Sequence, residues 1–292
     1  MLDVIIALLP ATVAAGVLFG LRALLLIAVS VATAVLSEFV FNLICKKTQT
    51  VGDLSAVVTG LLLALNLPTT TTIWQTIVGA FFAIIVVKCL FGGIGCNFAN
   101  PAITARVLML VAFSSTVASA SAPTMADVDV IASATPLAVL GGVEGTLPEI
   151  TDMLLGLRGG AIGETCIIAL VLGFVYLVAR RVIQWHTPVI FIGTVFVLSF
   201  LLGGFDVSVA LYHVLSGGLF LGAIFMATDY STTPTNSLGK MIFALGCGII
   251  TVLIRFFGSY PEGVSFAILF MNILAPFVEG WTARRPFGGA QK

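Results

Sequence analysis

The sequence predicts an all-α integral membrane protein. Its composition and the length and pattern of its apolar runs lead to this prediction. Hydrophobic residue types make up 59% of the 292 residues and charged types only 9%, whereas a soluble domain carries about 25% charged residues. Lipid must therefore solvate most of the surface. The runs are uniformly apolar, unlike the alternating strands of a membrane barrel, and helices satisfy their own backbone groups in lipid.

Ten apolar runs mark the expected helices. They are 4–19, 23–45, 54–67, 73–91, 101–113, 166–183, 189–202, 207–228, 241–257 and 264–278. We therefore expect about ten transmembrane helices. Residues 1–113 would form a first transmembrane half, 114–164 a polar loop, and 165–292 a second transmembrane half.

Several runs are shorter than the roughly 20 residues that a full crossing needs. The third run ends at Pro68, the fifth follows a glycine-rich stretch, and the eighth passes Gly217 and Gly218. The segments "LLLALNLPTTTT" and "GAIFMATDYSTTPTN" end the third and eighth runs. We interpret this as a weak repeat of five helices. Because five is odd, the second copy would be inverted, and interrupted helices of inverted repeats place a ligand site between the halves.

Basic residues predict the orientation in the membrane. The first side of a ten-span arrangement holds nine of them and the other side three, with Arg106 inside the fifth run. The nine are Lys46, Lys47, Lys88, Arg180, Arg181, Lys240, Arg284, Arg285 and Lys292, and the three are Arg22, Arg158 and Arg255. Under the positive-inside rule both termini are cytoplasmic and the loop 114–164 is extracytoplasmic. The formal net charge of zero gives no support to nucleic-acid binding, and no signal peptide is expected.

Familiar enzyme constellations are missing from the sequence, so no catalytic residue and no metal site are predicted. There is no glycine-rich phosphate loop, nucleophile elbow or histidine cluster. The five cysteines have no paired metal-type spacing and are expected to be small buried hydrophobes. A single cysteine lent to a cluster shared with another subunit remains an alternative.

Two polar clusters lie where helices are interrupted. In "GGIGCNFANPAITAR" (92–106), Asn97 and Asn100 are three residues apart, so one helical turn would place both amides on one face. Amides at bilayer depth need partners, and a heteroaromatic ring with carbonyls and ring nitrogens would supply them. The alternative is a helix start, with Asn100 as the cap before Pro101.

The second cluster is "ATDYSTTPTNS" (227–237), in which Asp229 is the one carboxylate. It could accept a hydrogen bond from a ligand or guide a cation, or it could be a turn or capping aspartate.

Glu38 lies inside the second run, and the simplest interpretation pairs it with Lys46 or Lys47 near the interface. The outer-loop segment "DVDVIASATPLA" (127–138) is by composition an ordinary turn.

Together these segments resemble a known family. "LDVIIALLPATVAAGVLFG", "SAVVTGLLLALNLP", "GGIGCNFANPA", "ASATPLA" and "GAIFMATDYSTTPTN" are similar, in the same order, to the D subunits of the Rnf complex, the ion-translocating ferredoxin:NAD oxidoreductase. They are also similar to the homologous B subunits of the sodium-pumping NADH:quinone oxidoreductase. Those B subunits are longer at the N-terminus, so the length of this chain favours the Rnf type.

The resemblance implies two flavins. In the family, a flavin transferase joins the phosphate of FMN to a threonine in a pattern close to D-x-x-S/T-G-A-T. Here that threonine is Thr135, with Asp129 and Ala134 matching, while Ala132 and Ser133 depart from the pattern but remain small. The second flavin, riboflavin or a relative, is held without a covalent bond, and the positions carried over for it are Thr59, Asn97, Asn100 and Asp229.

The resemblance further implies a multi-pass subunit of a cell-membrane (inner or plasma membrane) complex that couples ferredoxin/NAD electron transfer to Na⁺ or H⁺ translocation. The subunit would not be an enzyme alone. Its partners would be a second covalent-flavin subunit, iron–sulfur subunits, an NADH-binding subunit and the flavin transferase. The residues alone leave open a channel or secondary transporter for a small polar solute, and the resemblance leaves open a sodium-pumping NADH:quinone oxidoreductase.

Overall fold

The structure is a computed structural model that describes all residues except 120, 122, 124–134, 144–145, 259–261 and 284–292. Its described part is helical, without a β-strand; one isolated bridge joins Ser121 and Gly160. The all-α prediction is therefore confirmed.

Each of the ten predicted runs coincides with a helical segment. The first half contains α1 (Leu2–Phe19), α2 (Leu21–Ile44), α3 (Ser55–Leu65), α4 (Ile73–Phe81) with its π-helical continuation η2 (Phe82–Cys89), and α5 (Pro101–Ala112), with the 3₁₀ turn η1 (Val51–Asp53) before α3. The second half contains α9 (Ile167–Ala179), α10 (His186–Leu202), α11 (Val207–Leu215), α12 (Leu219–Leu221) with the π-helix η4 (Gly222–Met226), α13 (Ser237–Phe257) and α14 (Val264–Thr282).

Not all of these segments are long enough to cross a bilayer. Four helices in the described part are long and apolar enough alone, namely α1, α2, α13 and α14, and the pair formed by α11 and 219–226 would be a fifth, broken by a bend of 63°. The other five apolar segments have 10–17 residues. The predicted interruption at Gly217 and Gly218 is thus confirmed as a bend between α11 and α12.

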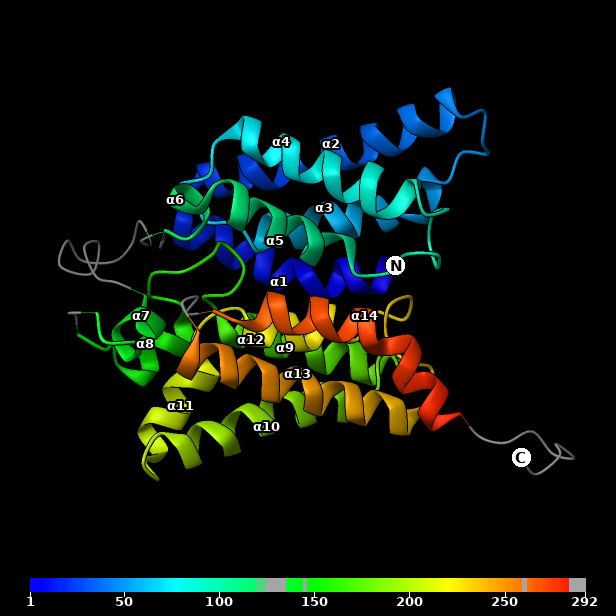
Figure 1. The fold of residues 1–292 in the computed structure, drawn as a ribbon. Coiled ribbons are helices and arrows are strands. Elements are labelled where there is room, and N and C mark those ends of the chain that lie inside the picture. Colours follow the sequence, from blue (N-terminus) through cyan, green and yellow to red (C-terminus); the bar gives the residue numbers. More distant parts are fainter. Residues whose placement is uncertain (120, 122, 124–134, 144–145, 259–261, 284–292) are drawn as a thin grey trace, which may run out of the picture.

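The helices pack in a way that fits the predicted repeat. In the first half α2 packs on α3 and α4, and in the second half α10 packs on α11 and α13. The halves meet where α1 contacts α9 and α5 contacts α14. Figure 1 shows α2, α4 and α5 on one side of the bundle and α10, α13 and α14 on the other. Equivalent helices therefore have equivalent neighbours, while the inverted arrangement itself stays a prediction.

The two ends of the bundle differ. The N-terminus and the end of α14 lie at one end, and α6 (Ser114–Val117), α7 (Pro136–Leu140) and α8 (Ile150–Leu155) lie at the other (Figure 1). These short helices belong to the segment predicted as a polar loop, and the sequence pattern did not reveal them. We call these the termini end and the loop end.

The last part of the predicted loop is not a surface segment, which corrects the sequence-based expectation. The backbone N–H groups of Ile162 and Gly163 donate to the carbonyls of Leu67 (3.0 Å) and Leu65 (2.7 Å), and residues 158–165 are buried. Because α3 stops at Leu65, its last carbonyls need partners. The returning loop supplies them, so it completes the interrupted helix.

Candidate functional site

Four of the five predicted site residues line one cavity at the seam between the halves. Thr59 comes from α3, Asn97 and Asn100 from the loop before α5, and Asp229 from the turn after η4. The cavity has a volume of about 140 Å³, and Ser55 and Lys88 also line it. We call it the asparagine cavity. The structure therefore brings together residues that lie up to 170 positions apart in the chain.

Asn97 has the side chain in this cavity that is most available to a ligand. Its Oδ1 is buried and has no hydrogen-bond partner in the described part of the chain. The Thr59 hydroxyl donates to the Ser55 carbonyl at 3.0 Å, so its oxygen can still accept. A buried acceptor without a partner is costly. Imide, ring N–H or hydroxyl donors of a flavin would satisfy these two oxygens.

Asn100 is the N-cap of α5, which is the alternative role that the sequence left open for it. Its Oδ1 accepts from the backbone N–H of Ala102 (3.0 Å) and Ile103 (3.3 Å), and Pro101 occupies the first helical position. Its Nδ2 donates to Oδ2 of Asp229 at 3.4 Å. The amide is thus already occupied at both ends, which leaves Asn97 as the freer asparagine.

Asp229 is also held by its own turn. The Ser231 hydroxyl (3.0 Å) and the Thr232 hydroxyl (3.3 Å) donate to its Oδ2, and the Ser231 N–H donates to Oδ1. Burial raises the pKa of this carboxyl, while the hydrogen bonds from Ser231 and Thr232 lower it. Asp229 therefore orders the 227–233 turn and anchors Asn100 to it, across the seam between the halves.

A buried ion pair forms one wall of the asparagine cavity, and it corrects the expectation for Glu38. Lys88 Nζ donates to Glu38 Oε1 at 2.8 Å and to the Ser55 hydroxyl; both charged side chains are almost fully buried. Glu38 does not pair with Lys46 or Lys47. Those lysines are its neighbours in the chain, whereas Lys88 reaches it because η2 packs on α2.

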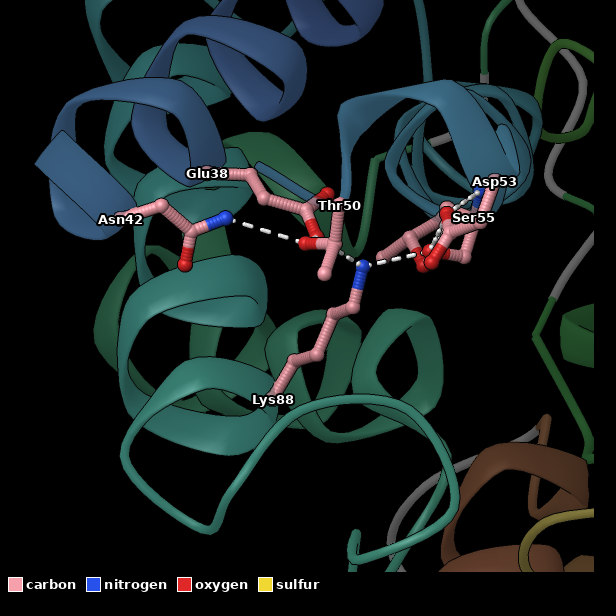
Figure 2. Close-up of polar contacts among 7 residues, drawn as sticks. Glu38, Asn42, Thr50, Asp53, Ser55 and Lys88 are labelled. Carbon is pink, nitrogen blue, oxygen red and sulfur yellow. Dashed lines mark hydrogen bonds and ion pairs between the residues drawn. The ribbon is translucent and has the colours of Figure 1, made fainter. Parts of the chain in front are cut away.

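Polar neighbours extend this pair in both directions (Figure 2). Thr50 donates to Glu38 Oε1 (2.6 Å) and accepts from Asn42 (3.0 Å), and the Ser55 hydroxyl donates to Asp53. Glu38, Asn42 and Thr50 line a separate cleft of about 270 Å³. The ion pair thus stands between this cleft and the asparagine cavity. Sequence reasoning counted Lys88 as a loop residue, although its place in the apolar run 73–91 was a signal, because an ionisable residue inside a span is usually functional.

Thr135, the fifth predicted site residue, lines a different cavity at the loop end. It caps α7, and its Oγ1 accepts from the Ala138 N–H at 3.2 Å. The cavity has a volume of about 80 Å³ and is also lined by Arg106, Arg158, Glu164 and Glu262. We call it the arginine cavity. Asp129, Ala132, Ser133 and Ala134 of the predicted pattern lie outside the described residues.

Five charged side chains meet around the arginine cavity. Arg106 pairs with Glu262 Oε2. Arg158 donates to the Glu164 carbonyl at 3.0 Å, and Arg255 donates to the carbonyls of His213, Ser216 and Glu262. Burial lowers the pKa of Arg158 and raises the pKa of the Glu164 carboxyl.

This cluster was missed because the sequence interpretation placed Arg158 and Arg255 in a solvated outer region. In the structure both are buried. The available signal was again a charge inside or beside an apolar run.

The part of the chain that the structure describes holds no group of three or more His, Cys, Asp or Glu side chains that could bind a metal ion. Cys89 and Cys247 are buried as expected, Cys166 is half-buried, and Cys45 and Cys96 are exposed. The expectation of buried cysteines is therefore wrong for the last two, both of which lie in loops after a helix end.

Comparisons with known proteins agree on one family. The model of the NQR2, RnfD, RnfE family matches residues 1–288. The D subunit of the Na⁺-translocating ferredoxin:NAD⁺ oxidoreductase complex of Acetobacterium woodii is 44% identical over 99% of this chain and 90% of its own length. The D subunit of the proton-translocating complex of Clostridium ljungdahlii is 39% identical over 99% and 91%. The D subunit of the ion-translocating oxidoreductase complex of Halorhodospira halophila is 35% identical over 99% and 90%.

Proposed function

The chain belongs to the NQR2, RnfD, RnfE family, and we propose that it is the flavin-carrying D subunit of an Rnf-type complex. That complex couples electron transfer between ferredoxin and NAD to ion translocation, as the names of its relatives state for theirs. The chain acts as one subunit of this membrane oxidoreductase and is not an enzyme alone.

The observation that carries the flavin proposal is the presence of two separate cavities, one for each expected flavin. Asn100 lines the asparagine cavity and Leu110 the arginine cavity, and both residues belong to α5 or its cap. Ten residues of α-helix rise about 15 Å. Two cofactor stations on one helix, one toward each end of the bundle, suit a subunit that conducts electrons between the two membrane faces.

In the asparagine cavity, Asn97 and Thr59 would hold riboflavin or a related flavin without a covalent bond. Their oxygens would accept hydrogen bonds, and Lys88 would present a positive charge from the cavity wall. The cavity is smaller than the roughly 300–1,000 Å³ of pockets that enclose a drug-sized ligand. Two of its walls, 94–100 and 228–231, are loops, so they can move apart to admit the ring.

At the loop end, Thr135 would carry FMN through a phosphoester. Its side chain lies on the wall of a cavity that presents arginine N–H groups without partners, Nε and Nη1 of Arg106 and Nε of Arg158. These donors fit a phosphate. When bound, the flavins would supply the redox chemistry, while the protein supplies position and electrostatics.

The rest of the proposal concerns the orientation in the membrane, the partner subunits and the coupled ion. The subunit would sit in the cell membrane with both termini cytoplasmic and residues 114–164 outside. A second covalent-flavin subunit, iron–sulfur subunits and an NADH-binding subunit would be its partners in the complex, and a flavin transferase would load Thr135. The coupled ion would be Na⁺ or H⁺, since the relatives include one complex named for each.

The decisive experiment is mass spectrometry of the intact chain from a host that contains the flavin transferase. The expected mass exceeds that of the polypeptide by one FMN phosphoester, and Thr135→Ala should remove this increment together with the flavin fluorescence of the band in a denaturing gel. The conservative exchange Thr116→Ala, which removes another hydroxyl at the loop end, is the matched control and should keep both signals.

A channel or secondary transporter would carry no flavin. An unmodified mass in the presence of an active transferase, or fluorescence that persists in Thr135→Ala, would contradict the assignment of Thr135.

A further inference from the structure

The charges around the arginine cavity do not balance. Among the described residues, two arginines, Arg106 and Arg158, and two glutamates, Glu164 and Glu262, line the cavity. A third arginine, Arg255, lies directly beside them and donates to the Glu262 carbonyl. One positive charge is therefore in surplus. Burial raises the pKa of Glu164, so any proton that it takes up would only enlarge this surplus.

The surplus lies on side chains that are almost fully buried. Arg158 is 2% exposed, Arg106 4%, Glu164 7% and Arg255 9%. An unpaired charge that is buried in a protein at membrane depth is strongly unfavourable, and such groups normally pair with one another or with a ligand. An anion in the cavity would remove this cost.

The hydrogen bonds show where an anion would bind. Arg255 is satisfied, because three backbone carbonyls accept from its guanidinium. In contrast, Nε and Nη1 of Arg106 and Nε of Arg158 are buried without partners among the residues that the structure describes, and both side chains line the cavity, as does Thr135. The free donors of this site are thus on the two arginines that face the cavity.

The free carboxylate oxygens gather at a different point. Glu164 Oε2 and Glu262 Oε1 also lack partners among the described residues, and an added Cβ on Gly218 would lie 3.3 Å and 3.1 Å from them. These acceptors therefore lie together beside the break between α11 and α12.

We propose that the arginine cavity is the binding site for the phosphodiester that joins FMN to Thr135, with Arg106 and Arg158 as its ligands. The inference rests on the proposed function, because it takes the ester at Thr135 as given. A phosphodiester carries a single negative charge, which equals the surplus, and N–H donors to phosphate make strong charge-assisted bonds. The cavity of about 80 Å³ has room for a few water molecules, so its size suits the phosphate group and would not enclose the flavin ring.

Variants that change the net charge around the arginine cavity test the proposal. The full-length chain is purified in detergent from hosts with and without the flavin transferase, and intact mass confirms which preparation carries FMN. Thermal unfolding is then compared between the loaded and unloaded forms of each variant, so that the measured quantity is the shift in Tm upon loading. Because each variant is its own reference, a general loss of stability does not affect the comparison.

The expected shifts in Tm differ in size between the variants. Loading should raise the Tm of the wild-type chain by several degrees. Arg158→Gln removes the surplus charge, so its loading shift should be lost, while Arg158→Lys should restore part of it. Glu262→Gln adds a second surplus charge, so its shift should exceed that of the wild type. Arg22→Gln removes an exposed arginine at the start of α2 and should leave the wild-type shift unchanged.

Two results would overturn the inference: a wild-type-sized shift in Arg158→Gln, or a shift in Glu262→Gln that does not exceed the wild type. If Arg158→Gln yields no folded protein, Glu262→Gln decides alone. The ³¹P resonance of the loaded chain gives a second readout and should move between wild type and Arg158→Lys. A wild-type chain that carries no FMN on Thr135 would instead refute the proposed function.

Discussion

At the scale of single residues, Glu38 and Lys88 form an ion pair in which both side chains are almost fully buried. Taking two charges out of water is costly, and their attraction offsets that cost only when the geometry is good. Here Lys88 also donates to Ser55, and Thr50 donates to Glu38. The hydrogen bonds of the pair thus converge on Glu38 Oε1 and Lys88 Nζ, while Glu38 Oε2 is buried without a partner among the described residues. Either partner alone would be an uncompensated buried charge.

This reasoning predicts a non-additive response to substitution. Lys88→Met should lower the free energy of unfolding by about 3–5 kcal/mol, because breaking a buried pair leaves one charge behind. The double change of Lys88→Met with Glu38→Gln should cost less than Lys88→Met alone, since neither charge remains. Thermal unfolding of the purified chain in detergent measures both. Lys46→Met, which removes an exposed lysine, is the control and should change little.

A double variant that is as unstable as Lys88→Met would refute the interpretation of the pair as mutually compensating charges. The packing lost with the lysine stem would then account for the effect.

The sequence predicted some of these residues and missed others for a definable reason. Thr59, Asn97, Asn100 and Asp229 were predicted together, and they do line one cavity. The family resemblance carried that prediction, because spacing alone supported only Asn97 and Asn100 as neighbours. The partner of Glu38 lies 50 residues away, and no local pattern encodes the packing of α2 on η2.

At the scale of helices, interruptions lie beside both cavities. The breaks after α3 and α11 adjoin the arginine cavity, and the loop before α5 and the turn after η4 line the asparagine cavity. α3 ends at Leu65 and α11 at Leu215, and π-helical segments η2 and η4 follow in the helices that continue each half. π-Helical turns occur frequently at functional sites. The breaks expose backbone groups and bring polar side chains to membrane depth, which a continuous apolar helix would not do.

The start of α5 allows the roles of the two asparagines to be separated. Asn97→Ala should lower the amount of dissociable flavin and leave folding intact, because no described residue donates a hydrogen bond to Asn97 Oδ1. Asn100→Ala should instead cost about 0.5–2 kcal/mol of stability, as expected for a lost helix cap. Asn100→Ser keeps a capping oxygen and should restore most of this stability.

Acid extraction of flavin, normalised to protein, and thermal unfolding measure the two effects separately. An extractable flavin ratio in Asn97→Ala equal to the wild type would show that Asn97 does not hold a flavin. Equal instability of Asn100→Ala and Asn100→Ser would argue against the cap.

The contact between α1 and α9 gives a second prediction about helices. A Cβ on Gly173 would lie 2.4 Å from the Ala7 carbonyl oxygen and 2.9 Å from Phe225 Cζ, so α9 approaches α1 through this glycine, as small residues allow in membrane proteins. Gly173→Ala should therefore destabilise the chain by roughly 1–3 kcal/mol, the usual cost of overpacking.

Gly193 in α10 is the matched control, because an added Cβ there meets nothing within 4 Å. Gly193→Ala should be neutral, or stabilising by up to about 1 kcal/mol through helix propensity. Comparison of the two variants by thermal unfolding in detergent separates the packing effect from propensity. Equal behaviour of the two would mean that α1 and α9 are not held in close contact.

At the scale of the whole molecule, hydrophobicity predicted the number and order of the apolar segments, because segments that lie in lipid must be apolar. Hydrophobicity did not predict how these segments and the loops between them pack together. Residues 158–165 return into the bundle and bond to the end of α3, although their composition is that of a loop. The charge pattern was also simpler than the fold, since four of the ten described Lys and Arg residues are buried and are not expected to act as topological charges. These four are Lys88, Arg106, Arg158 and Arg255.

The positive-inside argument becomes stronger once these four are set aside. Among the described residues, Lys46, Lys47, Arg180 and Arg181 are exposed and Lys240 is half-buried, whereas Arg22 is the exposed cation of the loop end. Arg284, Arg285 and Lys292 lie outside the described residues. Because exposed Lys and Arg beside the spans determine orientation, the termini end should be cytoplasmic and α6, α7 and α8 should lie on the outer face.

Cysteine labelling tests this orientation, provided that the labelled position is exposed. Ser121 is unsuitable, because it is 2% exposed and bonds to Gly160 and Thr69, whereas Thr146 is exposed at the loop end.

In a background with Cys45→Ser and Cys96→Ser, which removes the two exposed thiols, Thr146→Cys should react with a membrane-impermeant maleimide on intact cells. A chain that keeps Cys45 and Thr146 is the control, and it should react only after permeabilisation, since Cys45 follows α2 at the termini end. The reverse pattern would invert the topology. It would also move Thr135 and the arginine cavity to the cytoplasmic face, so the two flavin stations would exchange sides while their separation along α5 stayed the same.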